Sequence, residues 1–176
     1  KQSEQQLLFD ARGDRLTGLA NRAAFRERTD FALQMMASDA SRDALVAIID
    51  LDRFKDINDS LGLGTGDQLL ISVARALQQA LGSKDTLARL NEDEYAILRL
   101  FEGPAEAAVA RLVGTIQEAI ARPFPIDERV VEITASIGVA VASEAGARSA
   151  EPLISDANLA VYRAKAQGRA RAVKFD

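Results

Sequence analysis

Acidic side chains stand at the ends of two apolar runs in this sequence. One run ends at Asp50, and a later one is followed by the consecutive acids Glu92, Asp93 and Glu94. Carboxylates gathered in this way repel one another unless a cation or hydrogen bonds compensate, and burying an unpaired charge costs on the order of several kcal/mol. Mg²⁺ prefers oxygen ligands, usually a few carboxylates together with substrate phosphates. We therefore interpret Asp50 and Asp93 as ligands of a Mg²⁺ ion that accompanies a nucleotide, with Mn²⁺ as an alternative ion.

The other two acids of the hairpin have more than one interpretation. Glu94 is a candidate metal ligand and also a candidate base for a hydroxyl group. Glu92 and Glu94 could instead only keep an exposed turn hydrated. The residue types leave these alternatives open.

A possible base-recognition pair follows Asp50. Asn58 and Asp67 could together bind guanine, because a carboxylate accepts from the N1–H and amino groups while an amide donates and accepts. Alternatively, Asn58 is a turn former and Asp67 a helix cap. The intervening glycines of residues 62–66 resemble a phosphate-binding loop but lack its lysine–serine ending, so they are weak evidence alone.

Cations for the phosphates are available at three positions. Lys55 follows Asp50 closely, and Lys165 and Arg169 lie four residues apart near a predicted helix end. The alternative is that these side chains only decorate an exposed helix face.

Composition narrows the chemistry further. The chain has 176 residues and no cysteine or histidine, which removes thiolate chemistry and the usual general base. Its net charge of −4 argues against a broad nucleic-acid surface. We find neither a secretory leader nor an apolar run of about 18 residues that could span a membrane. These features predict a cytoplasmic domain, on its own or as the cytoplasmic part of a larger protein.

Periodicity and turn residues predict the elements that position these side chains. We expect one domain with an α+β fold, in which a β-α-β-β-α-β core forms a mostly antiparallel central sheet flanked by helices. Helices are expected at 21–37, 54–61, 67–81, 104–121 and 152–167, strands at 44–50, 86–90 and 94–101, and a hairpin from strands 123–127 and 130–142. The sheet would then bring Asp50 next to the acidic hairpin. We assign residues 1–13 to the end of an upstream linker or signalling helix, 14–172 to the domain, and 173–176 to the start of a C-terminal linker.

Several motifs together resemble the GGDEF family of diguanylate cyclases, which join two GTP molecules into cyclic di-GMP. Their fold is similar to nucleotidyl cyclase palm domains. The motifs cover about residues 14–172, and they are DRLTGLANR at 14–22, DLDRFKDIND at 50–59, GD at 66–67, NEDEY at 91–95, SIGVA at 136–140 and YRAKAQGR at 162–169.

The resemblance implies a role for individual residues. Asp50 and Asp93 would bind Mg²⁺ with the Leu51 carbonyl nearby, and Glu94 would assist the metal or the attacking 3′-hydroxyl. The nucleotide itself would be bound by Asn58 and Asp67 at guanine, by Lys165 and Arg169 at the terminal phosphates, and by the neighbouring Lys55, Asn91 and Glu92.

The signature departs from the family pattern at its turn. Asn91 and Glu92 replace two glycines, and Tyr95 replaces phenylalanine. Glycines at this point serve a tight turn with positive φ. Left-handed geometry at Glu92 would cost about 1–2 kcal/mol of conformational free energy. The resemblance therefore implies a degenerate signature with impaired placement of the α-phosphate.

A second departure affects feedback. The family's product-inhibition site uses an arginine three residues before an aspartate, and here Gly82 precedes Asp85. Glycine cannot replace bidentate recognition by arginine, so this site is predicted to be absent.

Three functions follow from these observations. The first is a degenerate domain that binds Mg–GTP and regulates a linked domain, such as an EAL phosphodiesterase, under an upstream sensory domain. Residues 171–176 resemble the junction into such an EAL domain. The second is an active diguanylate cyclase, which would work as a homodimer. The third is a nucleotide-free docking or dimerisation module.

Overall fold

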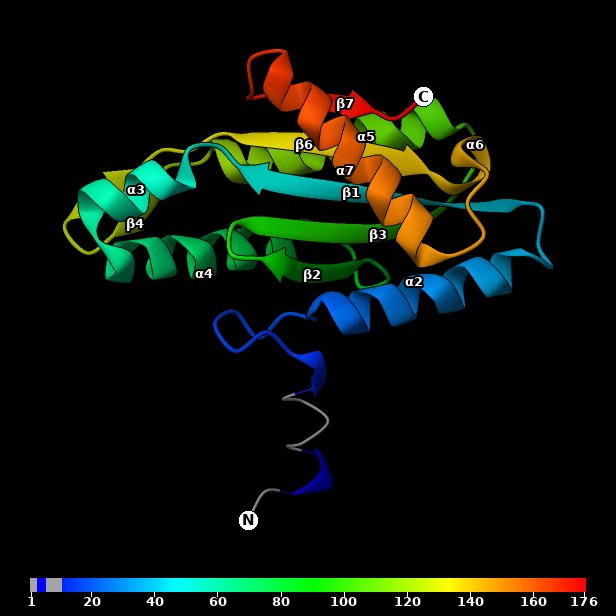
Figure 1. The fold of residues 1–176 in the computed structure, drawn as a ribbon, viewed down its shortest axis with the longest axis horizontal. Coiled ribbons are helices and arrows are strands. Elements are labelled where there is room, and N and C mark those ends of the chain that lie inside the picture. The colour runs from blue at the N-terminus through cyan, green and yellow to red at the C-terminus, as the bar shows by residue number, and fades with distance from the viewer. Residues whose placement is uncertain (1–2, 6–10) are drawn as a thin grey trace.

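A five-stranded sheet with helices on both faces forms the centre of the protein. The computed structural model describes residues 3–5 and 11–176. The strand order is β2-β3-β1-β6-β7, and every pairing is antiparallel except that of β6 with β7. Figure 1 shows α7 crossing one face of this sheet while α4 and α5 lie behind it. The elements are α2 (Arg22–Met36), β1 (Arg42–Leu51), α3 (Phe54–Leu61), α4 (Leu63–Ala80), β2 (Thr86–Asn91), β3 (Glu94–Glu102), α5 (Ala105–Ala121), β4 (Phe124–Ile126), β5 (Arg129–Val131), β6 (Ala135–Val141), α6 (Ala142–Ala145), α7 (Ala150–Ala166) and β7 (Ala172–Lys174).

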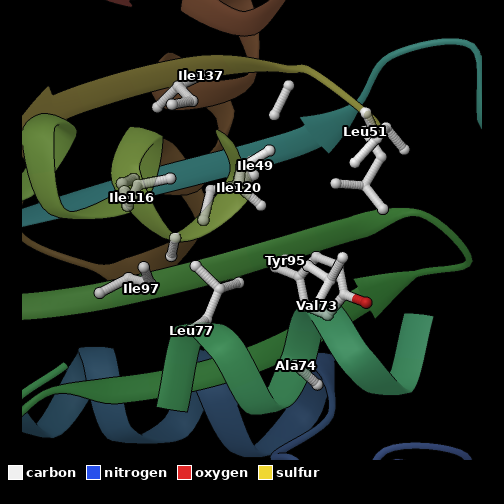
Figure 2. Packing of buried hydrophobic residues seen from close by; sticks show 14 of the residues in the cluster. Ile49, Leu51, Val73, Ala74, Leu77, Tyr95, Ile97, Ile116, Ile120 and Ile137 are labelled. Carbon is white, nitrogen blue, oxygen red and sulfur yellow. The ribbon is translucent and has the colours of Figure 1, made fainter. Parts of the chain in front are cut away.

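The central strand β1 supplies both halves of the core. Its continuous apolar run is buried from Ala44 to Ile49, which confirms the prediction of a strand covered on both faces. Because side chains alternate along a strand, Leu45 and Ile49 pack with α3, α4 and α5, whereas Val46 packs with α2 and α7. Figure 2 shows part of the half of the core that contains Ile49 and faces α4 and α5.

Helix α2 begins as expected. The side-chain oxygen of Asn21 accepts a hydrogen bond from the Ala24 amide at 3.0 Å, which caps α2.

The start of α4 differs from the prediction. Residues 62–66 were expected to form a loop, but α4 begins at Leu63 and takes Gly64 and Gly66 into its first turn. Only Gly62 keeps a glycine-specific conformation, with φ of 93° between α3 and α4. The prediction failed because glycine is a weak helix former, whereas in the folded protein tertiary contacts override this local propensity.

The segment after α5 also differs. The predicted hairpin after residue 123 is present, since β4 pairs with β5 in a separate two-stranded sheet, but its second strand is shorter than the predicted 130–142. The later part of that range is a separate strand, β6, which joins the central sheet beside β1. The short strand β7 was not predicted, and it pairs in parallel with β6. The expected domain boundary at residue 172 therefore falls inside a strand.

The observed architecture is the mixed α+β fold that the sequence predicts. The β-α-β-β-α-β order holds, with a mostly antiparallel sheet flanked by helices. Across the described part of the chain, no helix combines the length and apolar character needed to cross a membrane.

Candidate nucleotide and metal site

The hairpin between β2 and β3 lies beside the end of β1. The register of β1 and β3 pairs Asp50 with Glu94, and the Leu51 amide donates to the Asp93 carbonyl at 3.0 Å. The structure therefore brings together the acids that the sequence analysis expected to be adjacent. The cluster lies at one end of the two central strands.

These acids share a partly buried position that carries surplus negative charge. Burial raises the pKa of Asp50, and nearby Asp93 raises it further while the Lys165 ammonium opposes the shift. Burial also raises the pKa of Asp93. The pKa of Glu94 is raised by burial and then by Asp50. Three carboxyl groups that resist ionisation form a site whose charge a cation would compensate.

Two cations already reach the cluster, and one of them, Arg22, lies 3.8 Å from Glu94 Oε1. Lys165, in the last turn of α7, places Nζ 2.8 Å from Asp50 Oδ2. This contact shows that Lys165 lies in the site and not on an exposed helix face. Within residues 3–5 and 11–176, no three acidic side chains already form a set that could hold a metal ion.

The donor set nevertheless fits Mg²⁺. Asp50 and Asp93 supply hard carboxylate oxygens, the Leu51 carbonyl follows on the same strand, and Glu94 pairs with Asp50 across the ladder. Mg²⁺ commonly binds through one or two carboxylates and completes its shell with water and phosphate oxygens. An incomplete protein set of this kind is therefore suited to an ion that arrives with a nucleotide.

The hairpin turn does not carry the expected strain. Among the described residues, non-glycine positions with positive φ are Arg53, Asp127, Arg169 and Ala170, so neither Asn91 nor Glu92 is left-handed. The predicted penalty on Glu92 is therefore not incurred. The register of β2 and β3 shifts between Arg89 and Asn91, directly before the turn.

Side chains hold this turn in place. Arg89 Nε donates to the Glu92 carbonyl at 2.9 Å, and Arg89 also pairs with Asp14 at 2.9 Å. The amide of Asn91 donates to Glu94 Oε1 at 3.1 Å. The N-terminal motif and the turn thus form one network, and Asn91 helps to orient Glu94. Sequence reasoning missed Arg89, although an arginine directly before the acidic turn was a visible signal.

Tyr95 fits the core despite its hydroxyl group. The side chain is fully buried, and its hydroxyl donates to the Leu70 carbonyl of α4 at 2.6 Å. Burial raises the pKa of Tyr95. Figure 2 shows the ring beside Val73 of α4. The substitution is therefore mild, as the sequence analysis expected, because the added polar atom has a partner.

The two residues assigned to guanine lie on successive helices. Asn58 lies in α3 and Asp67 in the second turn of α4, so both alternatives, turn former and helix cap, are wrong. Asn58 Oδ1 is buried without any hydrogen-bond partner among the described residues. Asp67 is exposed and makes no hydrogen bond or ion pair within that part of the chain. Asp67 is therefore available to a ligand, whereas Asn58 Oδ1 is an enclosed acceptor that lacks a donor.

Gly66 makes room for Asn58. A Cβ atom on Gly66 would lie 1.7 Å from Asn58 Oδ1 and 2.9 Å from Asn58 Cγ. The glycine is therefore needed for a close approach between α3 and α4, not for a phosphate loop. This finding corrects the role assigned to residues 62–66.

The remaining cations differ in their surroundings. Lys55 is exposed on α3, and Arg169 is partly buried in the turn after α7 with φ of 65°. Neither side chain forms an ion pair with any residue that the structure describes. Both are therefore free to bind phosphates.

Asp85 is engaged elsewhere. Its carboxylate accepts from Arg99 Nε at 3.0 Å and from the second Arg99 nitrogen at 2.7 Å, and it also accepts from the Gly82 amide. Asp85 is thus already paired with Arg99, and the absence of a product-inhibition site stays a prediction that rests on Gly82.

The fold and the acidic cluster define an α+β domain similar to nucleotidyl cyclase palm domains, and comparison with known proteins refines this class. The family model described as "Diguanylate cyclase, GGDEF domain" matches residues 11–171. The chain therefore belongs to the GGDEF domain family.

Similar proteins carry the names of diguanylate cyclases and of cyclic di-GMP phosphodiesterases. Over 167 residues the chain is 38% identical to the bifunctional diguanylate cyclase/cyclic di-GMP phosphodiesterase MucR of Pseudomonas aeruginosa, covering 95% of this chain and 24% of MucR. It is 37% identical over 175 residues to the probable diguanylate cyclase DgcE of Escherichia coli, covering 98% of this chain and 15% of DgcE. The chain spans between 15% and 40% of the length of the curated relatives it matches.

Solved structures agree with the fold. The GGDEF domain of TpbB from Pseudomonas aeruginosa superimposes with a TM-score of 0.87 at 33% identity, covering 93% of this chain and 94% of that one. A sensory box/GGDEF family protein from Caulobacter crescentus gives a TM-score of 0.84 at 36% identity, covering 89% and 99%.

Proposed function

We propose that this GGDEF domain binds Mg–GTP at the cluster of Asp50, Asp93 and Glu94, with guanine at Asn58 and Asp67. The observation that carries the proposal is the buried, unpartnered Asn58 Oδ1 in the space kept open by Gly66. An unsatisfied buried acceptor is unfavourable in the free protein, and a guanine donor would satisfy it once the Asn58 side chain turns toward the ligand. Lys55, Lys165 and Arg169 would bind the phosphates, and Mn²⁺ could replace Mg²⁺.

Calorimetric titration tests this proposal. GTP with Mg²⁺ should bind, and ATP should bind at least about tenfold more weakly because adenine lacks the donors that Asp67 requires. Asp67→Asn should reduce this preference, because the amide removes one of two acceptor oxygens at an exposed position. The absence of any GTP binding up to millimolar concentrations would overturn the proposal.

The role we favour for the domain is regulation of a linked domain in cyclic di-GMP signalling. Relatives named as phosphodiesterases, such as NbdA and the bifunctional MucR, contain a similar segment within much longer chains. GTP binding would shift the linked domain only if the two arrangements differ in their affinity for GTP. We infer a cytoplasmic location, because GTP is available there, and an EAL-type neighbour with an upstream sensory domain.

A second candidate, an active diguanylate cyclase, is favoured by the relaxed turn. Asn91 and Glu92 avoid left-handed geometry, and Asn91 orients Glu94. Incubation of the dimerised domain with Mg–GTP and detection of cyclic di-GMP separates the two roles. Robust turnover would replace the regulatory role with a catalytic one.

A further inference from the structure

A buried carboxylate outside the proposed ligand set connects three segments around the site. Asp52 is 6% exposed and lies in the turn directly after β1, two residues beyond Asp50. Its Oδ1 accepts from Ser136 Oγ at 2.6 Å, and its Oδ2 accepts from Thr134 Oγ1 at 2.6 Å and from the Ala170 amide at 3.0 Å. Asp52 forms no ion pair with any residue in the described ranges. Its charge is therefore held by hydrogen bonds alone.

The Ala170 amide belongs to a turn that is unusual for its residue types. Arg169 and Ala170 both have positive φ, 65° and 51°, although neither is glycine. Left-handed geometry is unfavourable for a residue with a Cβ atom, and two such residues in succession persist only where surrounding contacts hold them. The hydrogen bond from Ala170 to Asp52 is a contact of this kind, and the Arg169 amide donates to the Ala164 carbonyl at 3.0 Å.

The same turn follows directly on the part of α7 that reaches the acidic cluster. Lys165 contacts Asp50 on one side of the turn, and the Arg171 carbonyl accepts from the Ile137 amide on the other side. The backbone of Arg169 is thus fixed at the end of the sheet where Asp50 lies. A different turn geometry would move the Arg169 guanidinium relative to the cluster.

We propose that Asp52 is a positioning residue: by holding the left-handed turn at Arg169 and Ala170, it places Arg169 for the terminal phosphates of the nucleotide. That Arg169 is placed for a nucleotide rests on the proposed function. That Asp52 holds the turn does not. The competing role for Asp52 is that of a third metal carboxylate next to Asp50. The two roles differ in what they require, since positioning needs an acceptor oxygen and metal binding needs the charge.

Asparagine separates these roles. In Asp52→Asn, the amide oxygen can still accept from Ala170 and Thr134, while the amide NH₂ donates to Ser136, whose hydroxyl can rotate. Positioning therefore predicts that Asp52→Asn keeps GTP affinity within about twofold, whereas Asp52→Ala loses about tenfold, as expected for one misplaced charged contact. Affinity for GMP, which lacks the terminal phosphates, should change by less than about twofold in both variants.

A rescue variant tests the turn directly. Ala170→Gly removes the Cβ that disfavours positive φ, so it should restore at least about threefold of the GTP affinity lost in Asp52→Ala. In an Arg169→Ala background, Asp52→Ala should add little further loss. If Asp52→Ala does not fold, Thr134→Ala, which removes one of the two donors to the same oxygen, gives a milder version of the test.

Hydrogen exchange supplies a readout that does not need GTP. Exchange of the Ala170 amide in the 176-residue chain should accelerate at least about tenfold in Asp52→Ala and remain near the wild-type rate in Asp52→Asn. If exchange follows this pattern but the wild type does not bind GTP, the turn-holding role of Asp52 stands and the proposed function is rejected. Unchanged exchange in a folded Asp52→Ala, equal loss of GMP and GTP affinity, or loss of Mn²⁺ binding in Asp52→Asn would each overturn the inference.

Discussion

The ammonium of Lys165 lies 2.8 Å from the carboxylate of Asp50, the residue proposed to bind the metal. In this arrangement Lys165 acts as the internal counter-ion of Asp50. On the proposed function, a divalent ion at Asp50 would compete with the ammonium for the same carboxylate. Lys165 would then leave Asp50 and become available to the phosphates.

The first prediction follows from this competition. Lys165→Met should bind Mn²⁺ alone about three- to tenfold more tightly, because Asp50 loses its competing cation. The same variant should bind GTP about tenfold more weakly, because a phosphate contact is lost. Mn²⁺ binding is measured by electron paramagnetic resonance and GTP binding by calorimetry. Lys55→Met, which does not touch Asp50, is the control for Mn²⁺, and weaker Mn²⁺ binding in Lys165→Met would contradict the competition.

The second prediction concerns the approach of α3 and α4. Gly66→Ala should destabilise the fold by about 1–3 kcal/mol, because the new Cβ overlaps Asn58, and should weaken GTP binding about tenfold. Gly64→Ala is a matched control, since nothing lies within 4 Å of a Cβ there, and it should gain up to about 1 kcal/mol. Thermal denaturation and calorimetry measure both quantities. Equal behaviour of the two variants would contradict the assigned role of Gly66.

The third prediction concerns pH. The folded pKa values of Asp50, Asp93 and Glu94 exceed their ordinary values of 3.8, 3.8 and 4.5, so the unfolded chain ionises first as pH rises. Metal-free stability should therefore fall as pH rises from about 3.8 through the raised folded pKa values, and stay lowered above them. Mg²⁺ should reduce this fall, and Asp93→Asn should flatten it. Thermal denaturation of the metal-free protein as a function of pH tests the sign. A rise in stability over this pH range that Asp93→Asn removes would contradict the prediction.

The fourth prediction concerns the altered signature. Asn91→Gly/Glu92→Gly should lower stability by about 0.5–1 kcal/mol per site, because no left-handed strain is present to relieve and glycine adds freedom to the unfolded chain. Urea denaturation measures the change. An increase in stability would show that these positions do carry strain.

The fifth prediction separates packing from binding at Tyr95. Tyr95→Phe should lose about 1 kcal/mol through the hydrogen bond to Leu70, with GTP affinity unchanged. Calorimetry and thermal denaturation of the same samples test it. A marked loss of GTP affinity would assign Tyr95 to the site.

Sequence predicted those features that depend on local chemistry. The buried strand β1 and the Asn21 cap follow from an apolar run and from a side chain that accepts a backbone amide. The three-residue strand β7 was missed because it is too short to show a period and depends on its pairing with β6. Asp52 was not assigned a structural role, since its donors at Thr134, Ser136 and Ala170 are more than 80 residues away in sequence. Pairing partners at such separations leave no local pattern.

The central claim is that the end of β1 and the hairpin hold a divalent ion together with GTP. Diffraction from crystals grown with Mn²⁺ and GTP, recorded for the anomalous signal of manganese, tests it most directly. We predict one manganese peak bound by Asp50 and Asp93 near the Leu51 carbonyl, with guanine against Asn58 and Lys165 turned from Asp50 toward phosphate. GTP bound elsewhere, or a bound nucleotide with Lys165 still on Asp50 and no manganese at the cluster, would contradict the account.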